Sequence, residues 1–346
     1  MSRNDPSLVI NNADLTAAVK SGIIDEASAT RLTDFVARGS VPLNSDDENL
    51  RLITGFNDIF VVIGLGLFLG ALFVVAKTYV YFILPLVAWG LAEVFTRRMR
   101  MALPSIVLLL VFVASVFGVV WMLVGHPEEA SRAWLGDINP GGFVLAAGAA
   151  VLAAALHWWR FHVPITFAAG AAALVGTAVG ALNVVMPGIL DQTSGMVFLP
   201  FGLGVFALAM WTDRQDRARR TQLSDRAFWL HLLAAPLIVH PLVWNMTKVA
   251  ELNLTSALMI VGLFLVLSLV ALVVDRRALL VSSLIYLGYA LSTIFGKQVF
   301  GAEGAGLAVL VVGSVVLLLS VAWKPLRRAL VINLPLKIQQ QVPLIS

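Results

Sequence analysis

The sequence predicts an all-α integral membrane protein with about ten transmembrane helices and both termini in the cytoplasm. Three observations support this class. The 346 residues are 59% hydrophobic and 13% charged, whereas soluble domains are about 45–50% apolar and about 25% charged. Long apolar runs follow one another from residue 59 to residue 323. Arginine and lysine cluster in every second gap between these runs, which is typical of loops that stay on the cytoplasmic side.

Residues 1–57 are polar and mixed in charge, and we expect a cytoplasmic helical hairpin and linker there. Asn12 and Asp25 are residue types that cap helix N-termini, and Gly22 and Gly39 stand where the two helices would end. A hairpin of this size cannot form a core alone. We therefore expect it to dock on the membrane domain, on a protein partner or on its copy in a homo-oligomer. No basic stretch precedes an apolar run at the start, so no cleavable signal peptide is expected.

Residues 58–323 are predicted to hold the transmembrane helices, and residues 324–346 a cytoplasmic tail. Several runs have about 18 residues, at the short end for a bilayer core about 30 Å thick. The first two runs meet at Lys77 and Thr78. A tight hairpin is favoured there over one broken helix, because the two runs together are far longer than one span. The predicted spans are residues 59–76, 78–95, 103–124, 142–159, 163–185, 196–212, 228–245, 255–274, 278–295 and 305–323.

The distribution of basic residues supports both the number of spans and their orientation. The gaps on one side, together with the tail, hold fifteen arginines and lysines, and the gaps on the other side hold four. Losing one span would place arginine-rich gaps on opposite sides, so the distribution favours ten spans with both termini inside. These bases lie in short gaps rather than on one soluble face, so the expected partner is the lipid bilayer and not nucleic acid. Five spans in each half would also suit an inverted repeat, although no motif is shared.

Several kinds of chemistry lack sequence support. The chain has no cysteine, so it cannot form a disulfide or a metal–thiolate site of its own. The Gly-x-Ser-x-Gly, His-Glu-x-x-His and P-loop patterns are missing, and neither a catalytic centre nor a cofactor is expected. Two histidines without a neighbouring carboxylate are a weak metal signal. The glycine-rich segment 301–306 has no lysine and is interpreted as a turn.

Polar side chains inside apolar spans are the first candidates for a functional site. His231 and His240 lie in the seventh span, nine residues apart and therefore on opposite faces of a straight helix. Pro236 can kink that helix and free a carbonyl. Asn57 and Asp58 open the first span. These five residues are candidates for lining a cavity or binding a substrate; the alternative is structural, with histidines bonded to neighbours and Asp58 at a favourable helix N-terminus.

Other patterns in the sequence concern helix packing, ion pairs and the coupling of transport to ions. Gly66–Gly70 and Gly176–Gly180 have the small-xxx-small spacing that lets helices approach closely. Glu93 stands four residues before Arg97, a spacing that suits an ion pair. Carboxylates are rare at depth, whereas a carrier driven by protons or sodium usually needs one there. Strong ion coupling is therefore not expected.

One family shares this layout. Residues 21–29 (Ser-Gly-Ile-Ile-Asp-Glu-Ala-Ser-Ala) and the approach to the first helix at 48–58 resemble uncharacterised bacterial polytopic proteins that carry a short N-terminal cytoplasmic hairpin. The resemblance concerns the layout of the whole chain. It implies a bacterial inner-membrane location and no particular activity. The number and orientation of the helices are also similar to the drug/metabolite transporter architecture.

Two functions agree with these observations. The first is a solute or lipid permease without strong ion coupling. The alternative is a non-transporting scaffold or assembly factor that binds partners through the hairpin and the tail. A polar cavity near His231, His240 and Asn57 would favour the permease.

Overall fold

The computed structural model describes residues 12–39, 56–124, 139–193, 195–217, 219, 221–249, 254–296 and 303–343. Within these ranges the regular structure is helical and includes no strand. The chain divides into two units, Met1–Asp47 and Glu48–Ile345, and each is described by itself. The predicted linker at residues 40–55 lies outside the described residues, and so do residues 301 and 302 of the predicted turn. Residues 303–306 form the first turn of a helix, so the interpretation of 301–306 as a turn was wrong for that part.

The first unit contains two helices, α1 (Asn12–Lys20) and α2 (Glu26–Gly39). They match the two predicted helices closely. Gly22 adopts a positive φ of 72°, the conformation that glycine supplies after a helix end. The Asp25 carboxylate accepts a hydrogen bond from the Ser28 backbone N–H at 3.2 Å and so caps α2. Hydrogen bonding by Ser28 also lowers the pKa of Asp25 below its ordinary value.

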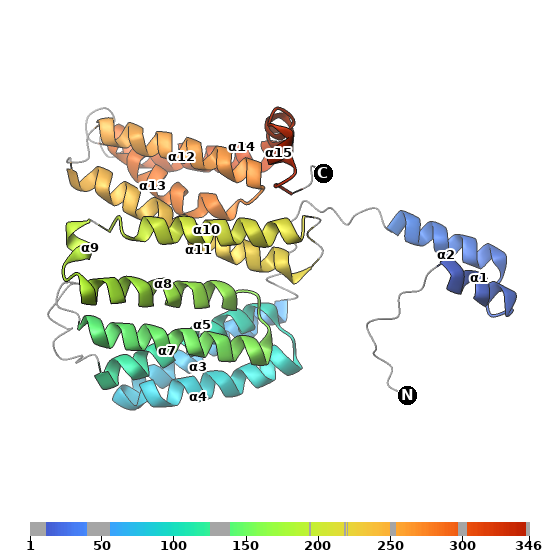
Figure 1. Cartoon of the computed structure of the whole chain (residues 1–346), viewed down its shortest axis with the longest axis horizontal. Coiled ribbons are helices and arrows are strands. Elements are labelled where there is room, and N and C mark those ends of the chain that lie inside the picture. The colour runs from blue at the N-terminus through green and yellow to red at the C-terminus, as the bar shows by residue number, and fades with distance from the viewer. Residues whose placement is uncertain are drawn as a thin grey trace. The chain divides into compact units, whose positions relative to one another are not determined.

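The second unit is a set of long helices that lie side by side with roughly parallel axes, as Figure 1 shows. The chain crosses the unit progressively, from α3–α5 on one side to α12–α14 on the other. The long helices are α3 (Phe56–Ala76), α4 (Val80–Ala92), α5 (Ala102–Val124), α7 (Pro140–Phe161), α8 (Thr166–Val185), α10 (Phe198–Gln215), α11 (Gln222–Val249), α12 (Leu254–Val274), α13 (Ala278–Gly296) and α14 (Glu303–Ile332). Shorter pieces are η1 (Lys77–Tyr79), η2 (Glu93–Arg98), α9 (Ile189–Gln192) and α15 (Leu336–Gln339).

Eight helical segments in the described residues are long and apolar enough to cross a membrane. This finding indicates a multi-pass membrane protein. It differs from the predicted ten spans at two places. Phe56–Arg98 counts as one segment of 43 residues, although it contains both α3 and α4, and Lys77 between them has a positive φ of 47°. The other place is α10, which is not among the eight, and its last turn carries Asp213 and Arg214.

The outer surface of the second unit is apolar. Leu67, Leu86, Leu152, Val185 and Val321 are each more than 70% exposed in the single chain. An aqueous surface does not carry so much exposed aliphatic area without a partner. Hydrocarbon is the solvent in which such faces are stable, and helices are one of the two structures that can cross it.

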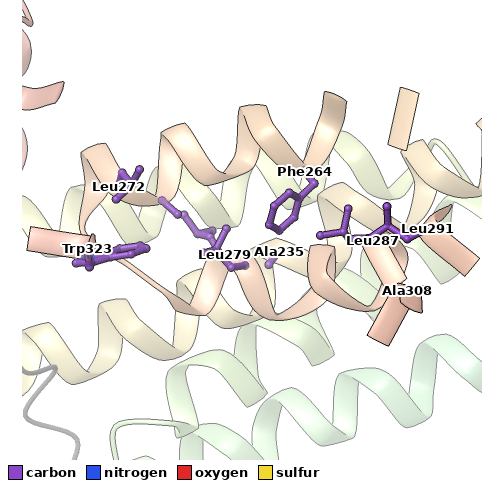
Figure 2. Close-up of a cluster of buried hydrophobic side chains, with 10 residues drawn as sticks. Ala235, Phe264, Leu272, Leu279, Leu287, Leu291, Ala308 and Trp323 are labelled. Atoms are coloured by element: carbon purple, nitrogen blue, oxygen red, sulfur yellow. The ribbon is translucent and has the colours of Figure 1, made fainter. Parts of the chain in front are cut away.

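The interior is built from clusters of apolar side chains between neighbouring helices. The largest lies around α13 and joins α11, α12 and α14. Figure 2 shows Phe264 of α12, Leu279 and Leu287 of α13 and Trp323 of α14 converging on this region, with Ala235 of α11 between them.

Glycines let certain helix pairs approach closely. A Cβ atom on Gly180 of α8 would lie 2.9 Å from a ring carbon of Phe143 in α7, and one on Gly202 of α10 would lie 2.9 Å from the backbone of Leu237 in α11. The close approach predicted for the Gly176–Gly180 pattern is thus confirmed at Gly180. At Gly66 and Gly70 no described atom lies within 4 Å of such a Cβ, so that pattern does not mark a helix contact within the described chain.

Four arginine-bearing turns gather at one end of the second unit. They are residues 97–101, 160–165, 216–221 (without 218 and 220) and 275–277, and α15 lies at the same end, next to α14 (Figure 1). Interactions join them: Arg219 bonds to Asp275, and Arg217 bonds to the carbonyl of Val342. We call this region, with residues 324–343, the arginine end.

The last long helix differs from its predicted length. The predicted span ended at residue 323, but α14 continues through Pro325 to Ile332. Arg327 and Val331, one turn apart, are both buried. This stretch is therefore held as a helix by packing at the arginine end, which a hydropathy pattern does not reveal.

Candidate functional site

A cavity of about 550 Å³ lies at the arginine end. Its lining comes from the end of η2 and the start of α5 (residues 96–106), the turn between α7 and α8 (160–165), and the start of α11 (222–229). The wall is mixed: Arg97, Arg100 and Arg160 bring cationic groups, whereas Ile106 and Trp229 bring apolar surface. A concave site with apolar walls and a few convergent polar groups is the usual form of a ligand pocket.

One of these arginines has its charge balanced. Arg160 donates to both carboxylate oxygens of Glu93, through Nε at 2.7 Å and Nη2 at 2.9 Å. This fork geometry is the strong form of an arginine–carboxylate pair. The predicted pair between Glu93 and Arg97 also exists, but it is longer, at 3.4 Å, and more exposed. Arg160 is the main partner of Glu93, and the sequence spacing did not indicate it because the two residues are 67 positions apart.

A second feature of the arginine end is a buried ion cluster, formed by Asp213, His231, Arg276 and Ser224. Asp213, from the last turn of α10, pairs with Arg276, whose Nε lies 3.1 Å from Oδ2. His231 Nε2 lies 3.1 Å from the same oxygen. Arg276 also donates to the carbonyl and the hydroxyl of Ser224, each at 3.1 Å. All four residues are buried, so the pairing of Asp213 with Arg276 is what keeps these two charges stable inside. The other ring nitrogen of His231, Nδ1, has no hydrogen-bond partner in the described part of the chain.

Asp275 is the centre of a neighbouring cluster. Its carboxylate accepts a hydrogen bond from Arg219 at 2.8 Å and one from the indole N–H of Trp323 at 2.7 Å. Arg327 lies 3.6 Å away on the other side. Arg277 covers the Trp323 ring at 5.1 Å from its centroid. This cluster ties the turn between α10 and α11 to the turn between α12 and α13 and to α14.

The tail is bound into the same end through its backbone carbonyls. Arg217 donates to the carbonyls of Gln339 and Val342, both at 3.0 Å. Arg327 donates to the carbonyl of Pro343 at 2.8 Å. We call these three bonds the tail clasp. They fix α15 and residues 339–343 against the turns.

The structure places the two candidate histidines in different environments. His231 is fully buried and belongs to the ion cluster. His240 is exposed and its Nδ1 bonds to the hydroxyl of Tyr286 in α13. One is buried and the other exposed, in agreement with the predicted opposite faces. Each has a neighbour of the kind that the structural alternative describes.

The other candidates lie apart from the cavity. Pro236 is exposed within α11, which continues past it to Val249. Asn57 is exposed and Asp58 is buried in the first turn of α3. The lining of the cavity contains none of the five candidates. On α11 it ends at Trp229, two residues before His231 and 11 residues before His240.

Some residues of interest were not singled out from the sequence. The segment 213–226 was counted only among the basic gaps that set the orientation, yet Asp213, Asp216 and Arg219 are buried. The signal that existed was its alternating charge next to the end of a span, matched by Asp275–Arg276 in a later turn. His157 was also overlooked: it is fully buried among aromatic rings, and its ring nitrogens have no hydrogen-bond partner in the described part of the chain.

The cavity brings cationic and apolar side chains together, a combination that suits recognition of a ligand. Among the described residues, no group of three histidine, aspartate or glutamate side chains could hold a metal ion. In the ion cluster the charges of Asp213 and Arg276 are paired with each other, whereas the cavity wall carries the exposed side chains of Arg97 and Arg100. No family model, curated protein or solved structure matches the chain.

Proposed function

We propose that this chain is a permease of the bacterial inner membrane for a solute or a lipid, without strong ion coupling. It has ten spans, both termini are cytoplasmic, and the arginine end faces the cytoplasm. The observation that supports transport best is the cavity at the arginine end, because a carrier needs a ligand-sized space with a mixed polar and apolar wall where its substrate enters. This cavity is not the one anticipated from the sequence, since His231, His240 and Asn57 do not line it.

The orientation is supported by the distribution of bases. The fifteen-to-four excess of arginine and lysine falls on the gaps that form the arginine end and on the tail. Short loops with such an excess remain in the cytoplasm. The hairpin between α3 and α4 and the crossing of α10 bring the eight apolar segments to ten spans.

Transport without strong coupling to ions is supported by the buried carboxylates at the arginine end, because they are paired with arginines. Asp213 is paired with Arg276, and Asp275 with Arg219. A carboxylate that is already neutralised by an arginine is a poor carrier of protons or sodium ions. Transport would then follow the gradient of the substrate itself.

The scaffold remains the second candidate. It is favoured by the first unit, where Ile23 at the turn is 76% exposed and offers an apolar contact to a protein partner or a second copy. The tail is less suited to this role, because the tail clasp already holds it.

The proposal is tested by reconstitution into lipid vesicles. Ala102 lines the cavity and Leu110, on the same helix, is exposed outside it. We expect flux of a labelled phospholipid or of a small solute with the wild-type chain, loss of flux with Ala102→Trp because the side chain fills the cavity, and normal flux with Leu110→Trp. An ionophore that dissipates the ion gradients should leave the flux unchanged. Flux equal to that of empty vesicles for every substrate would contradict the permease and favour the scaffold.

A further inference from the structure

We infer that the cavity at the arginine end binds a phosphate group, either as free phosphate or as the head group of a phospholipid. This inference names the ligand class of the proposed permease and rests on that function for what binding leads to. Three independent features of the cavity wall point to the same chemistry.

The first feature is cationic charge without a strong partner. Arg160 is neutralised by Glu93, but Arg97 meets Glu93 only at 3.4 Å and its side chain is 55% exposed. Arg100 is exposed and forms no ion pair within the described residues. Arginine side chains in this state are the usual donors to phosphate, because the guanidinium can bond two oxygens at once.

The second feature is the direction of three helices. Helices α5, α8 and α11 all begin at the cavity, and the residues at their starts, Ala102, Ile165 and Gln222, belong to its lining. The N-terminus of a helix carries a partial positive charge and unpaired N–H groups. Neither α5 nor α8 has an acidic residue in its first turn, so no carboxylate of these turns offsets the partial positive charge. At the start of α8 the N–H groups of Thr166 and Phe167 already donate to the carbonyls of Val163 and Pro164, so the contribution of α8 is that of its dipole.

The third feature is the apolar depth of the wall. Ile106 lies one turn into α5, and Trp229 two turns into α11. Phe161 closes the end of α7 beside them. A phosphate at the arginines would therefore sit next to a surface that suits hydrocarbon, which favours an amphiphile over a small inorganic ion.

One group in the wall opposes an anion. Asp225, in the first turn of α11, is the only carboxylate of the lining in the described chain. Its charge repels phosphate and is screened little in a partly buried site. This opposition makes a sharp test, because removing Asp225 and removing the arginines should change the affinity in opposite directions.

The first experiment measures binding of inorganic phosphate to the full-length purified protein by calorimetry. We expect the double variant Arg97→Gln/Arg100→Gln to weaken binding by about tenfold or more, the loss of two charge-assisted contacts. Asp225→Asn should strengthen it. Arg98→Gln is the matched control, because Arg98 lies in the same turn, is exposed and is not part of the lining.

The second experiment identifies the source of the phosphate. Native mass spectrometry compares phosphatidic acid with diacylglycerol of the same acyl chains, two lipids that differ in the phosphate alone. Phosphatidic acid that binds and is displaced by inorganic phosphate shows that the phosphate group suffices. Phosphatidic acid that binds and resists displacement assigns the site to a phospholipid.

Several outcomes would overturn the inference. These are equal binding of diacylglycerol and phosphatidic acid, equal weakening by Arg98→Gln and by the double variant, or weaker phosphate binding with Asp225→Asn. Flux that is blocked by Ala102→Trp but unchanged by the arginine variants would keep the permease and reject this ligand class. Phosphate binding without any flux would keep the site and reject the permease.

Discussion

At the arginine end, buried charges depend on single residues that pair with them. Asp213 is the acceptor shared by Arg276 and His231, and its exposed fraction is 1%. A buried ion pair contributes little net stability compared with apolar residues of the same shape, but removing one partner leaves the other charge buried alone. Replacing Asp213 by a neutral side chain of nearly the same size should therefore lower the stability of the protein strongly.

We expect Asp213→Asn to lower the free energy of unfolding by about 3–5 kcal/mol, because Arg276 keeps its charge without a counter-ion. Unfolding in mixed micelles measures the change. Asp191→Asn is the control, since Asp191 is exposed on α9 and forms no ion pair within the described residues. Equal stability of the two variants would contradict the role given to Asp213.

For single residues, the sequence predicted burial or exposure better than it predicted which side chains interact. The nine-residue spacing separated His231 from His240, and one is buried while the other is exposed. It did not reveal Asp213 or Arg276, because the first lies 18 residues from His231 and the second 63 residues from Asp213. Periodicity reports the face of a helix, whereas such pairs depend on which helices become neighbours.

The closeness of the contact between α10 and α11 differs between neighbouring glycines of α10. In α10, Gly202 meets the backbone of Leu237 and a side-chain carbon of Ile238, so that a Cβ would lie 2.9 Å from each. Gly204, two residues on, has no described atom within 4 Å of such a Cβ. The same substitution should therefore have opposite effects at the two positions.

We expect Gly202→Ala to destabilise the protein by about 1–3 kcal/mol, since α10 and α11 must move apart. Gly204→Ala should be neutral or stabilise by up to about 1 kcal/mol, because alanine favours the helix. Thermal unfolding in detergent compares the two variants. A similar loss for both would show that α10 and α11 do not pack as described.

The tail clasp holds the C-terminal tail against the turns of the arginine end. Deletion of residues 335–346 removes the three carbonyls that Arg217 and Arg327 bind. Each donor left without an acceptor costs about 1–3 kcal/mol where it is buried. We expect a clear fall in thermal stability, and little change when only residues 344–346 are removed. Equal stability of the two truncated chains would contradict the tail clasp.

The hydropathy of the sequence predicted where the long helices lie, but it often did not predict the residues at which they end. The predicted span 103–124 is close to α5 (Ala102–Val124), because an apolar run between charged turns defines it. The predicted span 305–323 stops nine residues before the end of α14 at Ile332. There the helix continues among buried groups such as Arg327, so packing and not apolar composition sets its length.

The whole molecule is organised by the alternation of its basic turns. Turns that are far apart in the sequence meet at the arginine end, where they form the cavity, the two ion clusters and the tail clasp. The alternation was visible in the sequence. The cavity was not, because its wall combines residues from three separate turns that become neighbours only after the helices pack.

The central claim is that ten helices cross the membrane with the arginine end in the cytoplasm. The chain has no cysteine, so single cysteines can be introduced and labelled in intact cells with a membrane-impermeant maleimide. Thr78, between α3 and α4, and Asp191, before α10, are exposed, as are Gln215, the last residue of α10, and Arg328 in α14. We expect labelling of Thr78→Cys and Asp191→Cys in intact cells, and of Gln215→Cys and Arg328→Cys only after the cells are opened. Protection of Thr78→Cys, or labelling of Asp191→Cys and Gln215→Cys from the same side, would contradict the ten spans and the orientation on which the proposed function depends.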